Sequence, residues 1–188
     1  MAIAKRLLNY LDKNKVKYEV VEHRKVFTAY DAAATMHRKL SQIAKNLLVK
    51  VDKDFVMAVL PASRNLDLKK LAKVIGAKKA ELPSERVMAS KFKVKPGALP
   101  AFGGLYKLPV YVDKSLLKER KVVFSSGDFQ ASIEMSVKDY LKLEQVEKGQ
   151  IASFSVAKKV KKAKQQKNKT KKRVRKNTKQ GKAKRRRQ

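Results

Sequence analysis

The stretch NLLVKV (46–51), DK (52–53) and DFVMAVL (54–60) decides the fold of this chain. The two longer runs are largely apolar, have the length of a strand and are rich in valine and leucine. Only two charged residues separate them. This pattern is typical of a β-hairpin, in which a short polar link reverses the chain. The sequence therefore predicts two paired strands at its centre.

Helical periodicity lies on both sides of this hairpin. Ile3, Leu7, Leu8 and Leu11 recur at helical spacing, which predicts an amphipathic helix over 2–14. Apolar residues repeat in the same way between 66 and 75, and Gly76 is placed to end that helix. Other helices are expected at 29–37 after the capping residue Thr28, at 84–91 with Pro83 in the first turn, and after Ser136.

Strands are interspersed with these helices. Further short apolar or alternating runs predict strands at 16–22, 79–82, 110–112, 122–124 and 132–135. Strands and helices mixed in this order favour one α/β or α+β domain over residues 1–146.

Charge divides the chain into two parts. There are 48 Lys and Arg against 16 Asp and Glu, a net charge of +32. Residues 158–188 contain 18 of the basic side chains and no acid, which leaves a net +14 in residues 1–157. We expect 147–157 to be a linker and 158–188 a disordered tail, because the tail has almost no apolar residues with which to build a core. Such a tail binds polyanions without reading sequence, so it favours a nucleic-acid partner over a merely solubilising role.

Several kinds of site are excluded or disfavoured by residue type. The chain has no cysteine, which excludes disulfides, cysteine-ligated zinc and a thiol nucleophile. His23 and His37 are its two histidines, and no third ligand at metal-binding spacing accompanies them, so we expect no metal and no cofactor. Catalysis would have to use a lysine, backbone groups or hydroxyls of the substrate. With no apolar run long enough for a membrane span and no signal peptide, we expect a soluble cytoplasmic protein without a membrane partner.

Lys45 is an unusual lysine. If residues 45–51 are extended, one face of the strand carries Lys45, Leu47, Val49 and Val51. A lysine at the rim of an apolar face either reaches out to water or points into a pocket. A helix that begins at Ser41 and continues through Lys45 would remove this pattern.

A glycine-rich loop follows in the second half of the chain. Gly97, Gly103 and Gly104 lie among Pro96 and Pro100. Glycines let the backbone approach a ligand closely, and clustered amides can donate to an anion or an oxyanion. The same residues could also form an ordinary connection.

These segments together resemble a known family. The carriers are EHR (22–24) with FTA (27–29), IAKNLLVK (43–50), AVLP (58–61), LDLKKL (66–71), PGALPAFG (96–103), LPVYVD (108–113) and SG (126–127). In this order they resemble the YbaK / prolyl-tRNA-synthetase-associated family of aminoacyl-tRNA deacylases over residues 1–143. The resemblance implies a mixed sheet flanked by helices, and hydrolysis of the ester that joins a wrongly attached amino acid to tRNA.

The resemblance also implies site residues and partners. Lys45 and Gly97 match positions at the catalytic site. We also expect His23, Gly103 and Gly127 to bind substrate, although His23 could equally be a structural histidine at the end of a strand. A ribose hydroxyl of the tRNA would help to activate water. The partner is the aminoacylated 3′ end of tRNA, with an aminoacyl-tRNA synthetase or the ribosome as further candidates. The family loop commonly ends SPFG or PPFG, whereas this chain has PAFG (100–103), and GDFQA (127–131) also departs from the family, which bears on amino-acid specificity.

Two alternatives remain open at the level of sequence. One is a non-catalytic protein that binds tRNA or the ribosome with the same fold, and a pocket filled by Phe55, Met57 or Phe102 would favour it. The other is a protein that compacts DNA, which rests on the basic tail alone.

Overall fold

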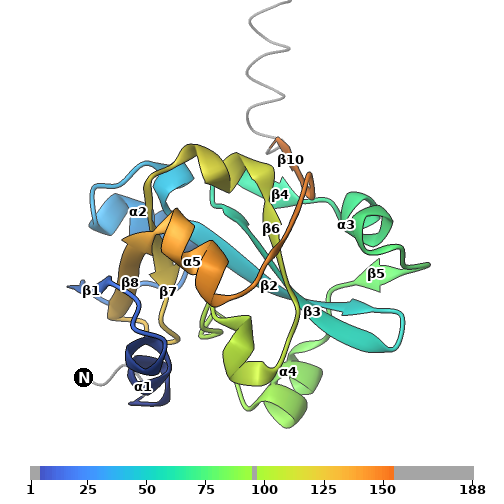
Figure 1. The fold of residues 1–188 in the computed structure, drawn as a ribbon, viewed down its shortest axis with the longest axis horizontal. Helices are drawn as coiled ribbons and strands as arrows, with labels where there is room; N and C mark the ends of the chain where they lie inside the picture. Colours follow the sequence, from blue (N-terminus) through green and yellow to red (C-terminus); the bar gives the residue numbers. More distant parts are fainter. Residues whose placement is uncertain (1–4, 95–96, 155–188) are drawn as a thin grey trace, which may run out of the picture. The chain divides into compact units, whose positions relative to one another are not determined.

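The computed structural model describes residues 5–94 and 97–154. Residues up to Ser153 belong to one compact unit, a mixed α+β domain in which helices flank the sheets (Figure 1). The predicted fold class is therefore confirmed. The predicted tail, 158–188, lies outside the described residues.

A five-stranded mixed sheet forms the centre, in the order β5-β2-β3-β6-β9. Its two longest strands are the antiparallel pair β2 and β3, and β6 and β9 add in parallel. The bounds are β2 (Ala44–Val51), β3 (Asp54–Pro61), β5 (Ala80–Glu81), β6 (Val110–Asp113) and β9 (Glu147–Gly149).

The central hairpin is confirmed. Its register runs from Ala44 opposite Pro61 to Val51 opposite Asp54. At the turn, Asp52 adopts a left-handed φ of 52°, and its carboxylate accepts hydrogen bonds from the backbone N–H groups of Lys78 and Lys79. The turn is thereby tied to the segment that leads into β5.

Two smaller sheets complete the strands. The order β1-β8-β7 is antiparallel throughout and joins β1 (Tyr18–Glu22), β7 (Lys121–Ser125) and β8 (Ala131–Ser136). The second has two strands, β4 (Arg64–Leu66) and β10 (Ala152–Phe154), which the sequence did not predict.

Helices begin and end at the residues that physical chemistry favours. The Thr28 hydroxyl accepts from the backbone N–H of Asp31, Asp67 and Ser136 cap two further helices in the same way, and Gly76 ends one of these with a φ of 76°. Pro83 is the exception. Ser84 is the capping residue of its helix, so Pro83 precedes the helix instead of occupying the first turn. The helices are α1 (Lys5–Lys13), α2 (Ala29–Thr35), α3 (Leu68–Ile75), α4 (Glu85–Phe92) and α5 (Val137–Leu143), with 3-10 turns η1 (Leu40–Gln42), η2 (Gly103–Tyr106) and η3 (Lys114–Lys118).

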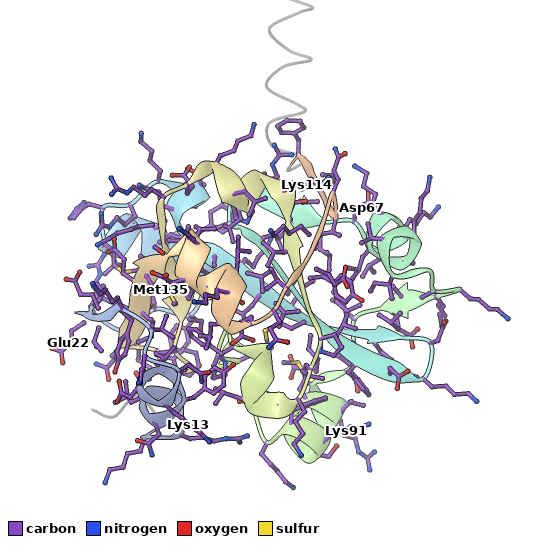
Figure 2. The ribbon with its side chains drawn as sticks, viewed as in Figure 1. Lys13, Glu22, Asp67, Lys91, Lys114 and Met135 are labelled. Carbon is purple, nitrogen blue, oxygen red and sulfur yellow. The ribbon has the colours of Figure 1, made fainter. Side chains whose placement is uncertain are left out.

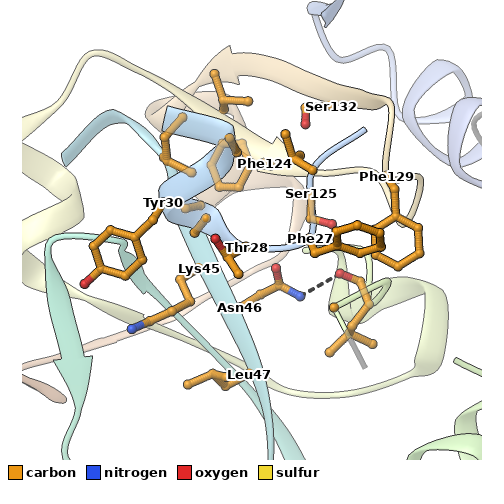
Figure 3. A pocket seen from close by; sticks show the side chains of 18 of the residues that line it. Phe27, Thr28, Tyr30, Lys45, Asn46, Leu47, Phe124, Ser125, Phe129 and Ser132 are labelled. Carbon is orange, nitrogen blue, oxygen red and sulfur yellow. Dashed lines mark hydrogen bonds between the residues drawn. The ribbon is translucent and has the colours of Figure 1, made fainter. Parts of the chain in front are cut away.

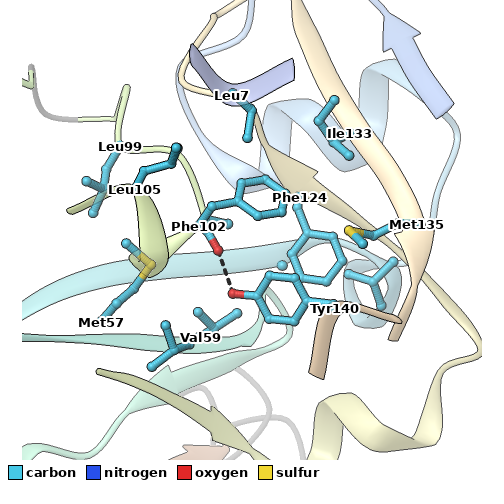
Figure 4. Packing of buried hydrophobic residues seen from close by; sticks show 14 of the residues in the cluster. Leu7, Met57, Val59, Leu99, Phe102, Leu105, Phe124, Ile133, Met135 and Tyr140 are labelled. Atoms are coloured by element: carbon cyan, nitrogen blue, oxygen red, sulfur yellow. Dashed lines mark hydrogen bonds between the residues drawn. The ribbon is translucent and has the colours of Figure 1, made fainter. Parts of the chain in front are cut away.

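The main core lies between the central sheet and the β1-β8-β7 sheet. Phe102, Phe124 and Tyr140 pack together there, with the rings of Phe124 and Tyr140 stacked at a centroid distance of 4.1 Å (Figure 4). The Tyr140 hydroxyl donates to the backbone carbonyl of Ala101. This contact fixes the predicted glycine-rich loop to the core.

A second apolar cluster covers the opposite face of the central sheet. Val49 and Val51 of β2 pack there with Leu71 of α3. Charged side chains such as Lys13, Glu22 and Lys91 lie on the surface, whereas Met135 is buried (Figure 2). Within residues 5–94 and 97–154, no helix is both long enough and apolar enough to cross a bilayer.

The segment after α5 differs from expectation, because part of the predicted linker forms strands. Glu147–Gly149 pairs with β6, and the buried Asp113 carboxylate accepts from the backbone N–H groups of Ile151 and Ala152, at 2.9 and 2.8 Å. The EKG sequence of β9 has no apolar residue, so periodicity could not reveal it. These residues are held by main-chain pairing and by one buried carboxylate.

Candidate functional site

A large cavity of about 590 Å³ opens beside β2 (Figure 3). Its walls come from segments far apart in sequence: the β1–α2 connection with α2, the first half of β2, the segment 82–88, the loop at 97–99, and β7 and β8 with the loop between them. Most of the lining side chains are apolar, with Lys45, Asn46 and several hydroxyl groups among them. Such a cavity with few polar groups is the usual form of a small-molecule site.

The pocket exists because, among residues 5–94 and 97–154, no strand pairs with β2 along part of one edge. Just before β2 begins, Ile43 makes an isolated parallel bridge to Val123. At the other end of β2, Lys50 and Val51 pair with β5. All residues from 43 to 48 line the cavity. Because side chains alternate between the two faces of a strand, a consecutive run can line one cavity only when the strand edge faces it. The cavity therefore lies against the main chain of β2.

Lys45 lies in this edge segment, in a strand and not in a helix. The η1 turn ends at Gln42, which settles the alternative in favour of the extended form. The Lys45 ammonium donates to the backbone carbonyl of Arg64 at 2.8 Å. Burial lowers the pKa of Lys45 from its usual value, because the charged form loses hydration. An ammonium has three donors, so donors remain for a ligand.

Asn46 connects the edge to the glycine-rich loop. Its side-chain amide donates to the backbone carbonyl of Leu99 at 2.8 Å (Figure 3). The loop residues 97–99 are thus held beside β2 by a side chain that the sequence analysis did not single out.

Gly97 lines the cavity at a point of close approach. Its φ is +79°, and a Cβ there would lie 3.3 Å from the carbonyl oxygen of Phe27 and 3.5 Å from the ring of Phe129. Those two rings pack at a centroid distance of 5.2 Å, and Phe27 is 61% exposed. A side chain at residue 97 would press on this aromatic wall.

His23 forms a defined pair with Ser132 at another wall. Its Nδ1 lies 2.9 Å from the carbonyl oxygen of Arg24, and its Nε2 lies 2.9 Å from the Ser132 hydroxyl. A carbonyl can only accept, so Nδ1 carries a proton and donates to Arg24, and in the neutral imidazole Nε2 accepts from the Ser132 hydroxyl. Both residues line the cavity.

The remaining two expected residues lie elsewhere. Gly103 packs in the interior, where a Cβ would come 2.4 Å from Val110, and Gly127, with φ +88°, packs against Pro100. Neither lines the cavity. The structure thus brings Lys45, Gly97 and His23 to one pocket, without Gly103 and Gly127. Within the part of the chain that the structure describes, no group of three or more His, Asp or Glu could hold a metal ion.

Phe27, Asn46, Phe129 and Ser132 are among the lining residues that the sequence analysis did not propose as site residues. Asn46 could have been found from its place next to Lys45. Phe27 and Phe129 are about a hundred residues apart, and nothing in the sequence pairs them.

The cavity lies within the part of the chain that matches a known family. The aminoacyl-tRNA editing domain family matches residues 23–143, which contain all of the residues that line the cavity. The chain belongs to this family. Among its family relatives, the multifunctional Ser/Thr-tRNA deacylase ProXp-y of Escherichia coli K12 is 31% identical, over 76% of this chain and 88% of the relative. The prolyl-tRNA editing protein ProX of Acetoanaerobium sticklandii is 28% identical, over 71% and 85%.

The editing-domain fold also recurs among solved structures. A crystal structure of a candidate trans-editing enzyme for prolyl tRNA synthetase matches with a TM-score of 0.72. The match covers 81% of this chain and 98% of the other at 23% identity, so it supports the shared fold alone.

Proposed function

We propose that this protein hydrolyses the ester bond of mischarged aminoacyl-tRNA, acting in trans. The observation that carries the proposal is the open cavity at the edge of β2, which brings Lys45 and Gly97 together inside the region of the family match. The two curated relatives described above are named as a tRNA deacylase and a tRNA editing protein. This chain aligns with most of the length of each.

The residues of the cavity suggest how the reaction proceeds. The Lys45 ammonium anchors the 3′-terminal nucleotide or the aminoacyl group. The backbone at Gly97 orients the ester carbonyl and stabilises the charge that develops on its oxygen. Water attacks the carbonyl carbon with help from a ribose hydroxyl, and the tRNA hydroxyl leaves. The proposal requires no metal and no organic cofactor.

The structure can be compared with what the second candidate, a non-catalytic RNA-binding protein, would require. That candidate would be favoured if Phe55, Met57 or Phe102 filled the pocket. Met57 and Phe102 are fully buried in the main core, and Phe55 packs against Phe92, with ring centroids 5.2 Å apart. None of the three lines the cavity. This supports the enzyme over the binding protein.

A panel of mischarged tRNAs tests the proposal. We expect the wild-type protein to release the amino acid from at least one of cysteinyl-, seryl- and threonyl-tRNA, the amino acids in the names of its curated relatives, faster than the uncatalysed reaction. The panel also identifies the amino acid. Failure to accelerate hydrolysis of any of them, while binding tRNA, would favour the non-catalytic candidate.

The basic segment 158–188 is proposed to supply RNA affinity. Its 18 cations can contact phosphates but carry no base information. If roughly six to eight of them contact phosphate, removing 158–188 should lower the slope of log K against log salt by about 4–7 in magnitude. The single-turnover rate at saturating tRNA should stay unchanged. An unchanged slope would show that RNA is bound elsewhere. A synthetase or ribosome partner and a cytoplasmic location remain part of the proposal.

A further inference from the structure

The main chain of β2 presents free hydrogen-bonding groups to the cavity. The carbonyl of Ile43 accepts from the N–H of Ala62 on the β3 side, at 2.8 Å. In an antiparallel pair, residues alternate between pointing their N–H and C=O groups at the partner strand and away from it. Lys45 and Leu47 therefore direct these groups at β3, and Asn46 and Leu48 direct theirs at the opposite edge.

That opposite edge is the floor of the cavity. Among residues 5–94 and 97–154, β5 pairs with β2 only at Lys50 and Val51, and the bridge to β7 is at Ile43. No strand of the described part of the chain covers Asn46 or Leu48. A bound ligand would remove these groups from water, and they then need a partner, since leaving them unpaired costs as much as a lost hydrogen bond. A ligand in the cavity can be that partner.

An aminoacyl ester has the required groups. Its α-ammonium is a donor and its ester carbonyl is an acceptor, in the same order and at nearly the same spacing as the N–H and C=O of one peptide residue. A residue in a hydrogen-bonded antiparallel pair exchanges both bonds with a single residue opposite. Extended peptides use this pattern when they add to a sheet edge.

We propose that the aminoacyl group of the substrate pairs with the main chain of Asn46 as a one-residue strand. The α-ammonium donates to the Asn46 carbonyl, and the ester carbonyl accepts from the Asn46 N–H. This inference rests on the proposed deacylase function. Asn46 lies at the middle of the open segment, and its side-chain bond to Leu99 fixes it beside the Gly97 loop.

The pairing has a consequence for recognition. Directly opposite residues on paired strands place their side chains on the same face. The amino-acid side chain would therefore lie on the face of Asn46, where Leu48 and Leu99 belong to the main core, and away from Lys45. The main-chain hydrogen bonds recognise the α-amino group of the substrate and do not depend on which side chain it carries. The ammonium bond is charge-assisted and so is the stronger of the two.

The first experiment removes the donor from the substrate. Wild-type, full-length protein is given cysteinyl-, seryl- or threonyl-tRNA, whichever it hydrolyses, and the same tRNA esterified with the matching α-hydroxy acid. Each rate is divided by the uncatalysed rate at the same pH, which removes the intrinsic difference between the esters. We expect the enhancement to fall about 10-fold or more for the hydroxy acid. Equal enhancements would overturn the inference and leave the deacylase function standing. No turnover of any aminoacyl-tRNA would overturn both.

The second experiment removes the donor from the protein. An α-hydroxy acid with the asparagine side chain, introduced at residue 46 by nonsense suppression, replaces the backbone N–H with an ester oxygen and keeps the side chain. The matched control is the lysine analogue at residue 50, whose N–H faces the same edge but is covered by β5 and lies outside the cavity. We expect kcat/KM to fall about 10-fold for the residue 46 ester and less than about twofold for the control, with thermal unfolding showing that both proteins are folded. Equal losses at the two positions, or a loss at 50 alone, would overturn the assignment to Asn46.

Discussion

The two halves of β2 have the same backbone conformation and opposite roles. Val49 and Val51, in the second half, are buried, and β3 and β5 flank this end of the strand on both sides. Lys45 and Asn46, in the first half, have β3 on one side and the cavity on the other. The difference lies in the neighbour and not in the strand. A strand that loses its neighbour for a few residues becomes a binding edge without any change in its own geometry.

Replacing one lysine in each half of β2 by alanine tests this contrast most strongly. Lys45→Ala should lower the deacylation rate by about 100-fold or more, because a substrate that loses its anchor is no longer held in the reactive position. Lys50→Ala should leave the rate unchanged, because its ammonium makes only a distant pair with Glu81, at 3.6 Å. Single-turnover kinetics on the substrate found in the panel measures both. Wild-type turnover by a folded Lys45→Ala protein would contradict the assignment.

Truncating a buried valine in the second half should change stability and not chemistry. Val49 is fully buried, so Val49→Ala should lower the free energy of unfolding by about 2 kcal/mol through lost burial and an unfilled cavity. The rate per folded molecule should remain that of the wild type. Urea unfolding measures the free energy of unfolding, and kinetics at a temperature where the variant is folded measure the rate. A large rate loss would show that the halves are not independent.

Two glycines with the same backbone angle extend the comparison to the loop. Gly97 and Gly76 have φ values of +79° and +76°, so alanine at either should cost about 1 kcal/mol of stability. Only at Gly97 does a Cβ meet neighbours, whereas at Gly76 nothing lies within 4 Å. We expect Gly97→Ala to lower kcat/KM about 10-fold, a cost of about 1.4 kcal/mol in the transition state, and Gly76→Ala to leave it unchanged. Similar rates for the two variants would make the loop at Gly97 a mere connection.

The smallest expected effect concerns pH. Burial lowers the pKa of Lys45 in the folded state. Above that lowered pKa and up to the unfolded value near 10.5, the unfolded chain binds more protons, so this group makes the folded state more stable as pH rises. The Lys45→Met protein should lack this increase in stability with pH. Comparing the urea unfolding of both proteins at pH 8 and pH 10 measures it, and a parallel pH dependence would place the Lys45 ammonium in water.

The sequence predicted the strand but not its open edge. Alternation placed Lys45 correctly on the face of Leu47 and Val49, because side-chain parity is a local property. Whether a strand has a neighbour depends on segments from other parts of the chain, here β5 and β7. For the same reason, the chain's glycines could not be sorted by sequence. Gly97 lies at the cavity because it is next to Phe27. Gly103 lies in the interior because it is next to Val110.

The buried carboxylate of Asp113 determines where this chain can be cut. It accepts the N–H groups of Ile151 and Ala152, and Ile151 is fully buried against the second apolar cluster. A protein ended after Val146 would leave Asp113 without these two donors and expose apolar surface on the sheet. A protein ended after Phe154 keeps both. Experiments that transfer the basic segment to another protein, or graft another segment here, should therefore use a junction beyond Phe154.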